Sequence, residues 1–542
     1  MSKQASWWRG GVIYQIYPRS YQDSTGDGIG DLAGITQRLD HIADLGVDAI
    51  WISPFFTSPM KDFGYDVSDY CDVDPMFGTL ADFDALLARA HTLGLKVMID
   101  LVLSHTSDQH RWFAESRHDR SNPKQDWYVW VDPQPDGTPP NNWLSIFGGG
   151  AWQWDTRRRQ YYMHNFLVSQ PDLNLHNRSV QDALLDVARF WLDRGVDGFR
   201  LDTINFYFHD PELRDNPPLS PEQRLTSIAP DVNPYGYQDH VYDRNRPENI
   251  AFLQRLRALM DQYPDRAAVG EVGDAVRSLE IVAEYTAGDD RIHMCYGFDF
   301  LGPEPITPAK VTQVLTDFAA KAPDAWSCWS LSNHDVIRHR TRLAAASGDP
   351  EAFTRLLAAL LLSLRGTICV YQGEELGLAE ANVPYEQLQD PYGIEFWPEF
   401  KGRDGCRTPM PWQATAPSAG FSDGLPWLPV SADHTARAVV GPDGTPNPMI
   451  GWYKALIEAR RNSPAIRTGS INFHQAGEGV LLFTRAGEDG TASVLCAFNI
   501  SDAAQTIAAP GASTAIIGSG GTAVGTQLSL GPYGLYWGSM AP

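Results

Sequence analysis

The chain has 542 residues, 43% of them hydrophobic and 20% charged, which is the composition of a globular protein too long for a single core. Its formal net charge of −23 argues against nucleic acid or an anionic membrane as a partner, because both attract Lys and Arg, whereas a neutral small molecule is not repelled. The six cysteines have no disulfide or metal spacing. No run approaches the ~20 apolar residues of a membrane helix, and the N-terminus does not resemble a signal peptide, so we expect a soluble, cytoplasmic protein.

Short apolar runs typical of β-strands recur along the chain, each followed by a stretch of helical character. They lie at 11–18, 47–54, 94–105, 196–204, 267–272, 291–300, 325–335 and 367–376. Runs that are apolar throughout suit parallel strands covered on both faces. Eight of them in strand–helix order predict an α/β fold, namely a closed (β/α)8 TIM barrel.

Uneven spacing between these strands indicates insertions. A Trp-, Gly- and Pro-rich segment follows the third strand, and long polar segments follow the fourth and the eighth. After the last helix, short strands with Gly-rich turns predict an antiparallel β-sandwich. The predicted domains are the barrel at 1–105 and 172–467, with an extra subdomain at 377–447, the inserted domain at 106–171 and the C-terminal β-domain at 468–542. The insertions leave from the carboxyl ends of strands, where barrel enzymes build active sites.

The loop DSTGDGIGD at 23–31 has the spacing of a cation-binding loop. Positions one, three, five, seven and nine of an EF-hand-like pattern are held by Asp23, Thr25, Asp27, the Ile29 carbonyl and Asp31. These oxygen ligands point to Ca²⁺ or Mg²⁺. Position twelve, however, is Gly34 rather than Glu, and a Gly-rich turn capped by aspartates explains the pattern equally well.

Ionisable residues close several of the predicted strands. They are Asp100 and His105 after the third, Arg200 and Asp202 on the fourth, Glu271 on the fifth, and His334 and Asp335 on the seventh. Carboxylates are depleted in strands and rarely buried unpaired, so their convergence on one barrel mouth suggests a catalytic cluster. Ion pairs at a polar barrel end are the alternative.

Three carboxylates suit the hydrolysis of a glycosidic bond. A retaining mechanism needs one to attack the anomeric carbon and one to protonate the leaving oxygen and then activate water. Arg200 and Asp202 are two apart on a strand and face the same side, where the guanidinium favours ionised Asp202. Glu271 lies in an apolar strand near other carboxylates, and both conditions raise the pKa of a general acid/base.

Ordered blocks carry a family resemblance. DLVLSHTS (100–107), GFRLDTIN (198–205), EVG (271–273) and SNHD (332–335) resemble the α-amylase family of glycoside hydrolases, and the resemblance covers essentially the whole chain. FGYDVSDY, QPDLN, YQGEELG and GRDGCRTPMPW look like its α-glucosidase and oligo-1,6-glucosidase branch.

The resemblance implies roles for individual residues. Asp202 is expected to be the nucleophile, Glu271 the acid/base and Asp335 the transition-state stabiliser. The glucose nearest the scissile bond is expected to contact Asp62, Tyr65, His105, Phe147, Phe166, Arg200, His334 and Arg403. The resemblance also implies one structural Ca²⁺ or Mg²⁺ in the 23–31 loop, without an organic cofactor. Asp62 paired with Arg403 would close the far end of the site and make the enzyme exo-acting.

These inferences predict a retaining exo-acting α-glucosidase, monomeric or homodimeric, that forms a covalent glucosyl-enzyme on Asp202. In the resembled branch, enzymes for α-1,6 bonds commonly carry Val after the nucleophile, and Thr203 here favours α-1,4-linked substrates such as maltose, or sucrose-like and aryl α-glucosides. Transglucosylation or sucrose isomerisation stays open because it shares the intermediate, although YGFDFLGP (296–303) lacks the RLDRD-type stretch of sucrose isomerases. A non-catalytic amylase-like binding protein is the alternative from another class.

Overall fold

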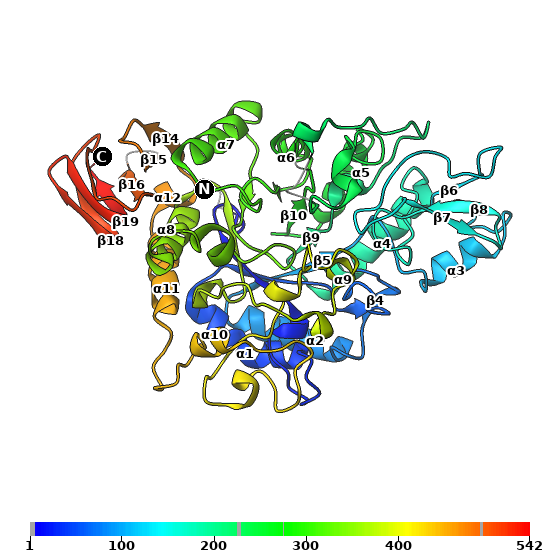
Figure 1. Cartoon of the computed structure of the whole chain (residues 1–542), viewed down its shortest axis with the longest axis horizontal. Helices are drawn as coiled ribbons and strands as arrows, with labels where there is room; N and C mark the ends of the chain where they lie inside the picture. Colours follow the sequence, from blue (N-terminus) through cyan, green and yellow to red (C-terminus); the bar gives the residue numbers. More distant parts are fainter. Residues whose placement is uncertain (1–5, 225–228, 275, 488–490, 542) are drawn as a thin grey trace.

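The computed structural model describes residues 6–224, 229–274, 276–487 and 491–541. A central barrel carries a small sheet at one end of the molecule and the C-terminal sheet at the other (Figure 1). None of the helices in these ranges has the length and apolar character needed to span a bilayer.

The barrel has eight parallel strands, ordered β11-β10-β9-β5-β2-β1-β13-β12. They are β1 (Val12–Ile16), β2 (Ala49–Ile52), β5 (Lys96–Leu101), β9 (Gly198–Leu201), β10 (Ala267–Glu271), β11 (Met294–Tyr296), β12 (Cys328–Trp329) and β13 (Thr367–Tyr371). An isolated parallel bridge between Cys295 and Ser327 joins the two ends of this order. The predicted eight-stranded barrel is confirmed, and each strand lies inside its predicted run.

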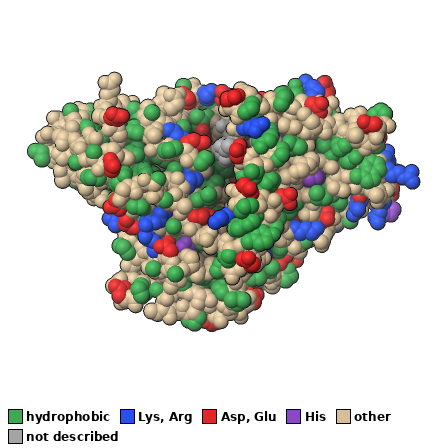
Figure 2. All heavy atoms as spheres, viewed as in Figure 1, with side chains coloured by type: hydrophobic (Ala, Val, Ile, Leu, Met, Phe, Trp, Pro, Cys, Tyr) green, Lys and Arg blue, Asp and Glu red, His purple; other side chains and the backbone are tan. Residues whose placement is uncertain are grey.

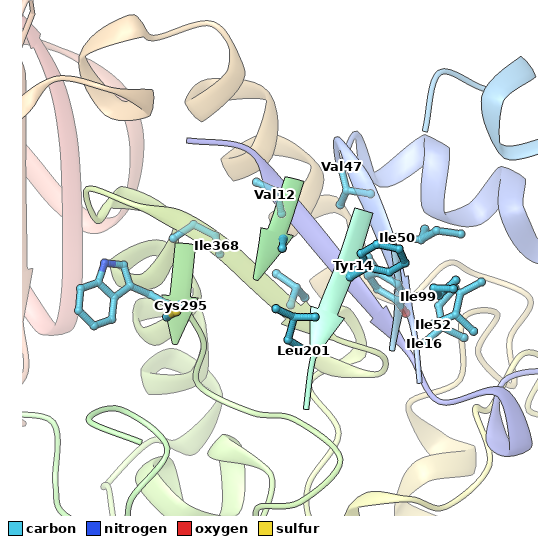
Figure 3. Packing of buried hydrophobic residues seen from close by; sticks show 14 of the residues in the cluster. Val12, Tyr14, Ile16, Val47, Ile50, Ile52, Ile99, Leu201, Cys295 and Ile368 are labelled. Atoms are coloured by element: carbon cyan, nitrogen blue, oxygen red, sulfur yellow. The ribbon is translucent and has the colours of Figure 1, made fainter. Parts of the chain in front are cut away.

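Side chains alternate between the two faces of the barrel strands. Tyr14, Ile50, Ile99 and Leu201 belong to the core between strands and helices (Figure 3). Ile13, Trp51, Met98 and Val269 fill the interior instead. Because strand side chains alternate with period two, the positions two residues beyond Met98 and Val269 also face inward. These positions are Asp100 and Glu271, so the strand pattern itself brings acids to the inner mouth of the barrel.

Helices cover the outside of the barrel. The main ones are α1 (Leu32–Leu45), α2 (Leu80–Thr92), α4 (Arg178–Arg194), α5 (Asn249–Met260), α6 (Ser278–Thr286), α7 (Pro308–Lys321), α8 (Pro350–Ser363) and α11 (Pro448–Arg461). Local sequence sets their ends. Asp31 caps α1 by accepting from the Gly34 N–H, and Gly46 ends it with a φ of 88°, which Gly adopts at no steric cost.

Insertions extend the carboxyl face of the barrel. After β5 come α3 (Arg111–His118) and an antiparallel sheet of order β6-β8-β7, formed by β6 (Trp130–Val131), β8 (Gln160–Met163) and β7 (Trp152–Asp155). After β2 come β3 (Phe56–Thr57) and β4 (Asp69–Val73). A π-helical turn, η5 (Arg340–Ala344), follows β12, and α9 (Pro391–Glu395) and α10 (Ala432–Ala436) follow β13.

The C-terminal domain is antiparallel, as predicted. Its strands are β14 (Ser470–His474), β15 (Val480–Ala486), β16 (Val494–Asn499), β17 (Gln505–Ala508), β18 (Ser513–Val524) and β19 (Gln527–Met540), and they join into one six-stranded sheet in which β19 pairs with β16, β17 and β18. Phe483 and Trp537 on one face belong to the core shared with the barrel helices. Leu482 and Leu495 on the other face form a separate cluster. The central strands β15 and β16 are therefore buried on both faces.

Candidate active site

A cavity of about 310 Å³ opens at the carboxyl ends of the barrel strands. Charged and hydrophobic side chains are interspersed on the molecular face shown in Figure 2, which is hollowed near its upper centre. The predicted site residues that line the cavity are Asp62, Tyr65, His105, Phe147, Phe166, Asp202, Thr203, Glu271, Asp335 and Arg403. The other two, Arg200 and His334, are fully buried beneath it. The structure thus brings together side chains that are more than 300 residues apart in sequence.

One buried guanidinium organises the acids. Nη1 of Arg200 donates to Asp202 at 2.5 Å and to Asp100 at 2.9 Å, while Nη2 donates to Glu271 at 2.5 Å. The hydroxyl of Tyr296 accepts from Nη2 at 3.0 Å. A buried charge is stable only when it is paired and hydrogen-bonded, and Arg200 meets that condition by holding Asp202 and Glu271 on its two terminal nitrogens.

Thr203 also spans this pair. Its hydroxyl donates to Oδ2 of Asp202 at 3.1 Å, and its N–H donates to Oε2 of Glu271 at 3.3 Å. Its φ of 37° lies in the left-handed region, a strained conformation for a β-branched residue. In this conformation, directly after β9, the Thr203 N–H faces Glu271 and the Thr203 hydroxyl faces Asp202. Two carboxylates that share donors in this way lie close together.

The environments of Glu271 and Asp335 drive their pKa values apart. Burial, reinforced by the neighbouring charges of Asp202 and Asp335, raises the pKa of Glu271 to about 8 despite Arg200. Burial alone would raise the pKa of Asp335 as well, but His334, Arg407 and Arg403 lower it below its ordinary value. Since burial keeps the pKa of His334 well below its usual range, that ring is neutral, and we assign the effect to the two guanidinium groups. Glu271 therefore carries a proton at neutral pH while Asp335 stays ionised.

One end of the cavity is closed by an ion-pair network. Arg403 donates to Asp62 at 2.9 Å and to Asp390 at 2.8 Å, and its guanidinium lies 5.0 Å from the centre of the Phe147 ring. The amide of Gln170 donates to the other oxygen of Asp62 at 3.0 Å. We call Asp62, Gln170, Asp390 and Arg403 the end wall. Burial raises the pKa of Asp62 to about 6 even though Arg403 opposes the shift.

Neutral polar rings lie at the floor of the cavity, where Tyr65 and His105 line it, and directly beneath it, where His334 is buried. Burial lowers the pKa of His105 to about 4, and its ring lies 5.0 Å from that of Phe166. The Tyr65 hydroxyl donates to Asp100 at 3.1 Å. Nδ1 of His334 accepts from the Gln15 amide at 2.7 Å. Uncharged imidazoles beside carboxylates are suited to hydrogen-bonding the hydroxyl groups of a neutral ligand.

Several residues of the site were not predicted as site residues from the sequence. Arg407 donates to Asp335 at 2.8 Å, and Gln170 and Asp390 complete the end wall. Tyr296 and Asp100 both accept hydrogen bonds from Arg200, and the sequence indicated Asp100 only as an acid at the end of a strand. Arg407 and Gln170 lie within GRDGCRTPMPW and QPDLN, two of the blocks that carry the family resemblance, and those blocks could have identified them as site residues.

The 23–31 loop has oxygen donors that fit a hard cation, but its carboxylates already have partners. Asp23 accepts N–H bonds from Thr25, Gly26 and Gly28 at 2.7 to 2.8 Å. Asp31 accepts from Ser24 as well as capping α1, and Asp27 accepts from Ile29. In the part of the chain that the structure describes, no three Asp, Glu, His or Cys side chains group as a metal site would require.

Comparison with known proteins places this geometry in a family. The model of the α-amylase catalytic domain matches residues 15–469. A probable alpha-glucosidase of Rhizobium meliloti is 65% identical over 500 residues, covering 92% of this chain and 90% of that protein. An oligo-1,6-glucosidase of Heyndrickxia coagulans is 36% identical, covering 92% of each.

Solved structures similar to this chain also include enzymes that act on glucosides. An alpha-glucosyl transfer enzyme, XgtA, has a TM-score of 0.94 at 55% identity, covering 99% of this chain and all of its own. The trehalulose synthase MutB of Pseudomonas mesoacidophila has a TM-score of 0.87 at 32% identity, covering 99% of both. MutB structures include complexes with sucrose, glucose and isomaltulose. The barrel, its acid cluster and the family match together show that this chain belongs to the α-amylase family of glycoside hydrolases.

Proposed function

We propose that the protein is a retaining, exo-acting α-glucosidase that releases glucose from the non-reducing end of short α-glucosides. The observation that carries the proposal is the sharing of Arg200 by Asp202 and Glu271, next to a cavity closed by Asp62 and Arg403. Relatives named α-glucosidase and oligo-1,6-glucosidase support the glucosidase activity. The non-catalytic alternative is not retained, because all three acids line the cavity and the relatives are named as enzymes.

The first half of the reaction uses both carboxylates. Asp202 attacks C1 of the terminal glucose as the glycosidic bond breaks, and Glu271 gives its proton to the leaving oxygen. This produces a covalent glucosyl ester on Asp202 and ionised Glu271. In the second half, Glu271 takes a proton from water, the water oxygen bonds to C1, and Asp202 leaves as a carboxylate. Two inversions at C1 retain the anomeric configuration.

The other cavity residues would hold the sugar. Asp335, kept ionised by Arg403 and Arg407, offers charge-assisted hydrogen bonds to glucose hydroxyls, and such bonds strengthen as the ring distorts. The end wall blocks the side of the glucose away from the scissile bond. A sugar chain that must end at this wall can place only its terminal glucose beside the catalytic carboxylates, and this accounts for exo action.

The linkage preference is tested by a panel of disaccharides. Enzymes of the resembled branch that cleave α-1,6 bonds commonly carry Val where this chain has Thr203, and Thr203 lines the cavity against both carboxylates, so we expect maltose to have a higher kcat/KM than isomaltose. Steady-state glucose release from each sugar decides the question. Faster cleavage of isomaltose would contradict the preference, and failure to cleave any α-glucoside would contradict the proposed function.

The raised pKa of Glu271 predicts the alkaline limb of activity. The acid must be protonated in the free enzyme, so kcat/KM is present below about pH 8 and falls as pH rises through that value. Above the limb the loss approaches about tenfold per pH unit. A pH profile of kcat/KM with maltose measures it, with circular dichroism at each pH as the control for folding. An alkaline limb at the ordinary Glu value near 4 would contradict the assignment of Glu271.

We further propose that the 23–31 loop binds one Ca²⁺ or Mg²⁺ with a structural role. The oxygen donors of Asp23, Thr25, Asp27, Asp31 and the Ile29 carbonyl support it, since hard cations prefer such ligands. We expect removal by a chelator to lower the Tm by a few degrees and added Ca²⁺ to restore it. Elemental analysis of the purified protein and thermal unfolding with and without chelator test this. A protein without bound metal and with an unchanged Tm would contradict it.

We also infer a cytoplasmic enzyme, monomeric or homodimeric. All six cysteines are free, as in a reducing compartment. Sedimentation equilibrium would distinguish the monomer from the dimer, and a trimer or larger assembly would contradict both. Cell fractionation tests the location, and recovery outside the cytoplasm would contradict it.

A further inference from the structure

A loop between the inserted domain and the barrel carries two side chains of the cavity. Residues 163–172 lead from the end of β8 back to the barrel, and we call them the pocket loop. Phe166, which lines the cavity, and Gln170, which belongs to the end wall, lie between its two ends. These ends meet at a narrow neck, where the Asp172 N–H donates to the Met163 carbonyl at 2.9 Å. The positions of Phe166 and Gln170 therefore depend on how the neck is held.

Two side chains close the neck, and each keeps one oxygen without a partner. Nδ2 of Asn165 donates to Oδ2 of Asp172 at 2.6 Å. Oδ1 of Asn165 and Oδ1 of Asp172 receive no hydrogen bond from any described residue. Both side chains are buried, with 1% and 4% of their surface exposed. A buried polar atom without a partner costs free energy, so two of them on side chains already in contact require a physical explanation.

The surroundings of Asp172 oppose a negative charge. Among the described residues, no Lys, Arg or His nitrogen lies within ion-pair distance of its carboxyl. Burial raises the pKa of Asp172 well above its ordinary value against the hydrogen bonds of Asn165, and the charge of Asp243 adds to the rise. Although burial opposes the effect, His240 and Arg244 lower the pKa of Asp243, which is therefore ionised. An ionised Asp172 would repel it.

The imidazoles next to the neck do not balance that charge. His105 is the bridge partner of Asp172, and His164 precedes Asn165. Burial lowers the pKa of each ring to about 4, so both are neutral at neutral pH. The His164 ring donates instead to the Phe166 carbonyl at 2.8 Å. A proton on Asp172 removes the buried charge and also supplies the missing donor, because a protonated carboxyl carries one O–H.

We propose that Asp172 is a neutral carboxylic acid that acts as a positioning residue, joined to Asn165 by two hydrogen bonds that hold the pocket loop. Its Oδ1–H donates to Oδ1 of Asn165, while its Oδ2 accepts from Nδ2, so every group of the pair has a partner. The pair keeps Phe166 and Gln170 where the terminal glucose binds. This last step rests on the proposed function, whereas the protonation of Asp172 does not.

Thermal unfolding at several pH values tests the neutral acid without any substrate. In the unfolded chain Asp172 ionises above about pH 4, so folding at neutral pH must restore its proton, and this contribution to stability falls as pH rises. Asp172→Asn keeps one donor and one acceptor toward Asn165 and has no proton to lose. We expect its Tm to exceed that of the wild type by a few degrees at pH 7, and the difference to shrink as the pH is lowered toward 5.

The matched control is Asp126→Asn, because Asp126 is an exposed carboxylate of the same inserted domain. Its Tm should follow that of the wild type at every pH. A Tm of Asp172→Asn that is equal to or below the wild-type value at pH 7 overturns the proposal, since an ionised Asp172, with or without a bound cation, loses an interaction in this variant. Infrared difference spectra of wild type minus Asp172→Asn provide a second readout. We expect the C=O band of a protonated carboxyl at pH 7, and a carboxylate band in its place overturns the proposal.

Kinetics with maltose test the positioning role. Asp172→Leu has a side chain of similar size that offers Asn165 no hydrogen bond, so we expect KM to rise about tenfold while kcat changes less, because the pocket loop binds the sugar. Asp172→Asn should restore KM to within about twofold of the wild type. Asn165→Leu breaks the same pair from the other side and replaces Asp172→Leu if that variant does not fold.

Two kinetic results overturn the positioning role. One is a wild-type KM in the Leu variant, and the other is an equal rise of KM in Asp172→Leu and Asp172→Asn. A wild type that cleaves no α-glucoside contradicts the proposed function instead. In that case the Tm and infrared results still decide whether Asp172 carries a proton.

Discussion

Asp202→Asn is expected to lower kcat for maltose about 10⁴- to 10⁶-fold, the range seen when an enzymatic nucleophile is removed. The amide has the shape of the carboxylate but cannot form the glucosyl ester. Arg200 keeps its bonds to Asp100 and Glu271, so we expect the fold to survive. Steady-state kinetics and thermal unfolding of the same preparation measure the two effects separately.

The control for this substitution is Asp433→Asn. The side chain of Asp433 is 58% exposed and, among the described residues, forms an ion pair only with the nearby Arg437, so the activity of this variant should equal that of the wild type. Full activity in Asp202→Asn would refute the assignment of the nucleophile. If Asp202→Asn loses both its activity and its fold, the nucleophile is identified in the wild type instead. The glucosyl-enzyme is trapped, and mass spectrometry locates the residue that carries the glucosyl group. In that experiment, a trapped glucosyl group on any other residue contradicts the assignment.

Glu271→Gln is expected to lower kcat for maltose about 10²- to 10⁴-fold, the usual contribution of a general acid/base. The expected loss of activity in this variant depends on the leaving group of the substrate. α-Glucosyl fluoride needs no protonation of its leaving group, so formation of the glucosyl-enzyme should be nearly normal while its breakdown is slow. Added azide, which attacks without a general base, should restore turnover and give α-glucosyl azide.

This rescue separates Glu271 from a merely structural carboxylate. Asp100→Asn is a useful comparison, because Asp100 also bonds Arg200 but does not line the cavity. We expect azide to rescue Glu271→Gln and not Asp100→Asn. Equal loss on maltose and on the fluoride in Glu271→Gln, without azide rescue, would contradict its role as acid/base.

The barrel could be predicted from sequence because its signal is local. Each strand is a continuous apolar run, and the alternation that directs Tyr14 outward and Ile13 inward follows from strand geometry alone. The same parity brings Asp100, Arg200 and Glu271 to one inner surface once the barrel closes. The acid cluster is therefore a consequence of strand order and period, and the individual roles came from the family resemblance.

The rest of the site could not be predicted because it depends on loop paths. Arg403 and Arg407 reach Asp335 from a long segment after β13 that has no periodic pattern. Arg342, which lines the cavity, bonds to backbone carbonyls of the loops after β11 and β12 only when these loops lie side by side. Such contacts depend on tertiary closure, and neither propensity nor spacing encodes them. The strained φ of Thr203 is of the same kind, since packing imposes it against the preference of the residue.

The proposed mechanism releases glucose with retained configuration through an ester on Asp202. The most direct test follows hydrolysis of an aryl α-glucoside by proton NMR from the first minutes, before mutarotation mixes the anomers, because this substrate releases a single glucose. The proposed mechanism predicts that the α-anomer signal of the released glucose rises first and the β-anomer follows at the mutarotation rate. Initial accumulation of the β-anomer would mean a single inversion by water and would contradict the mechanism.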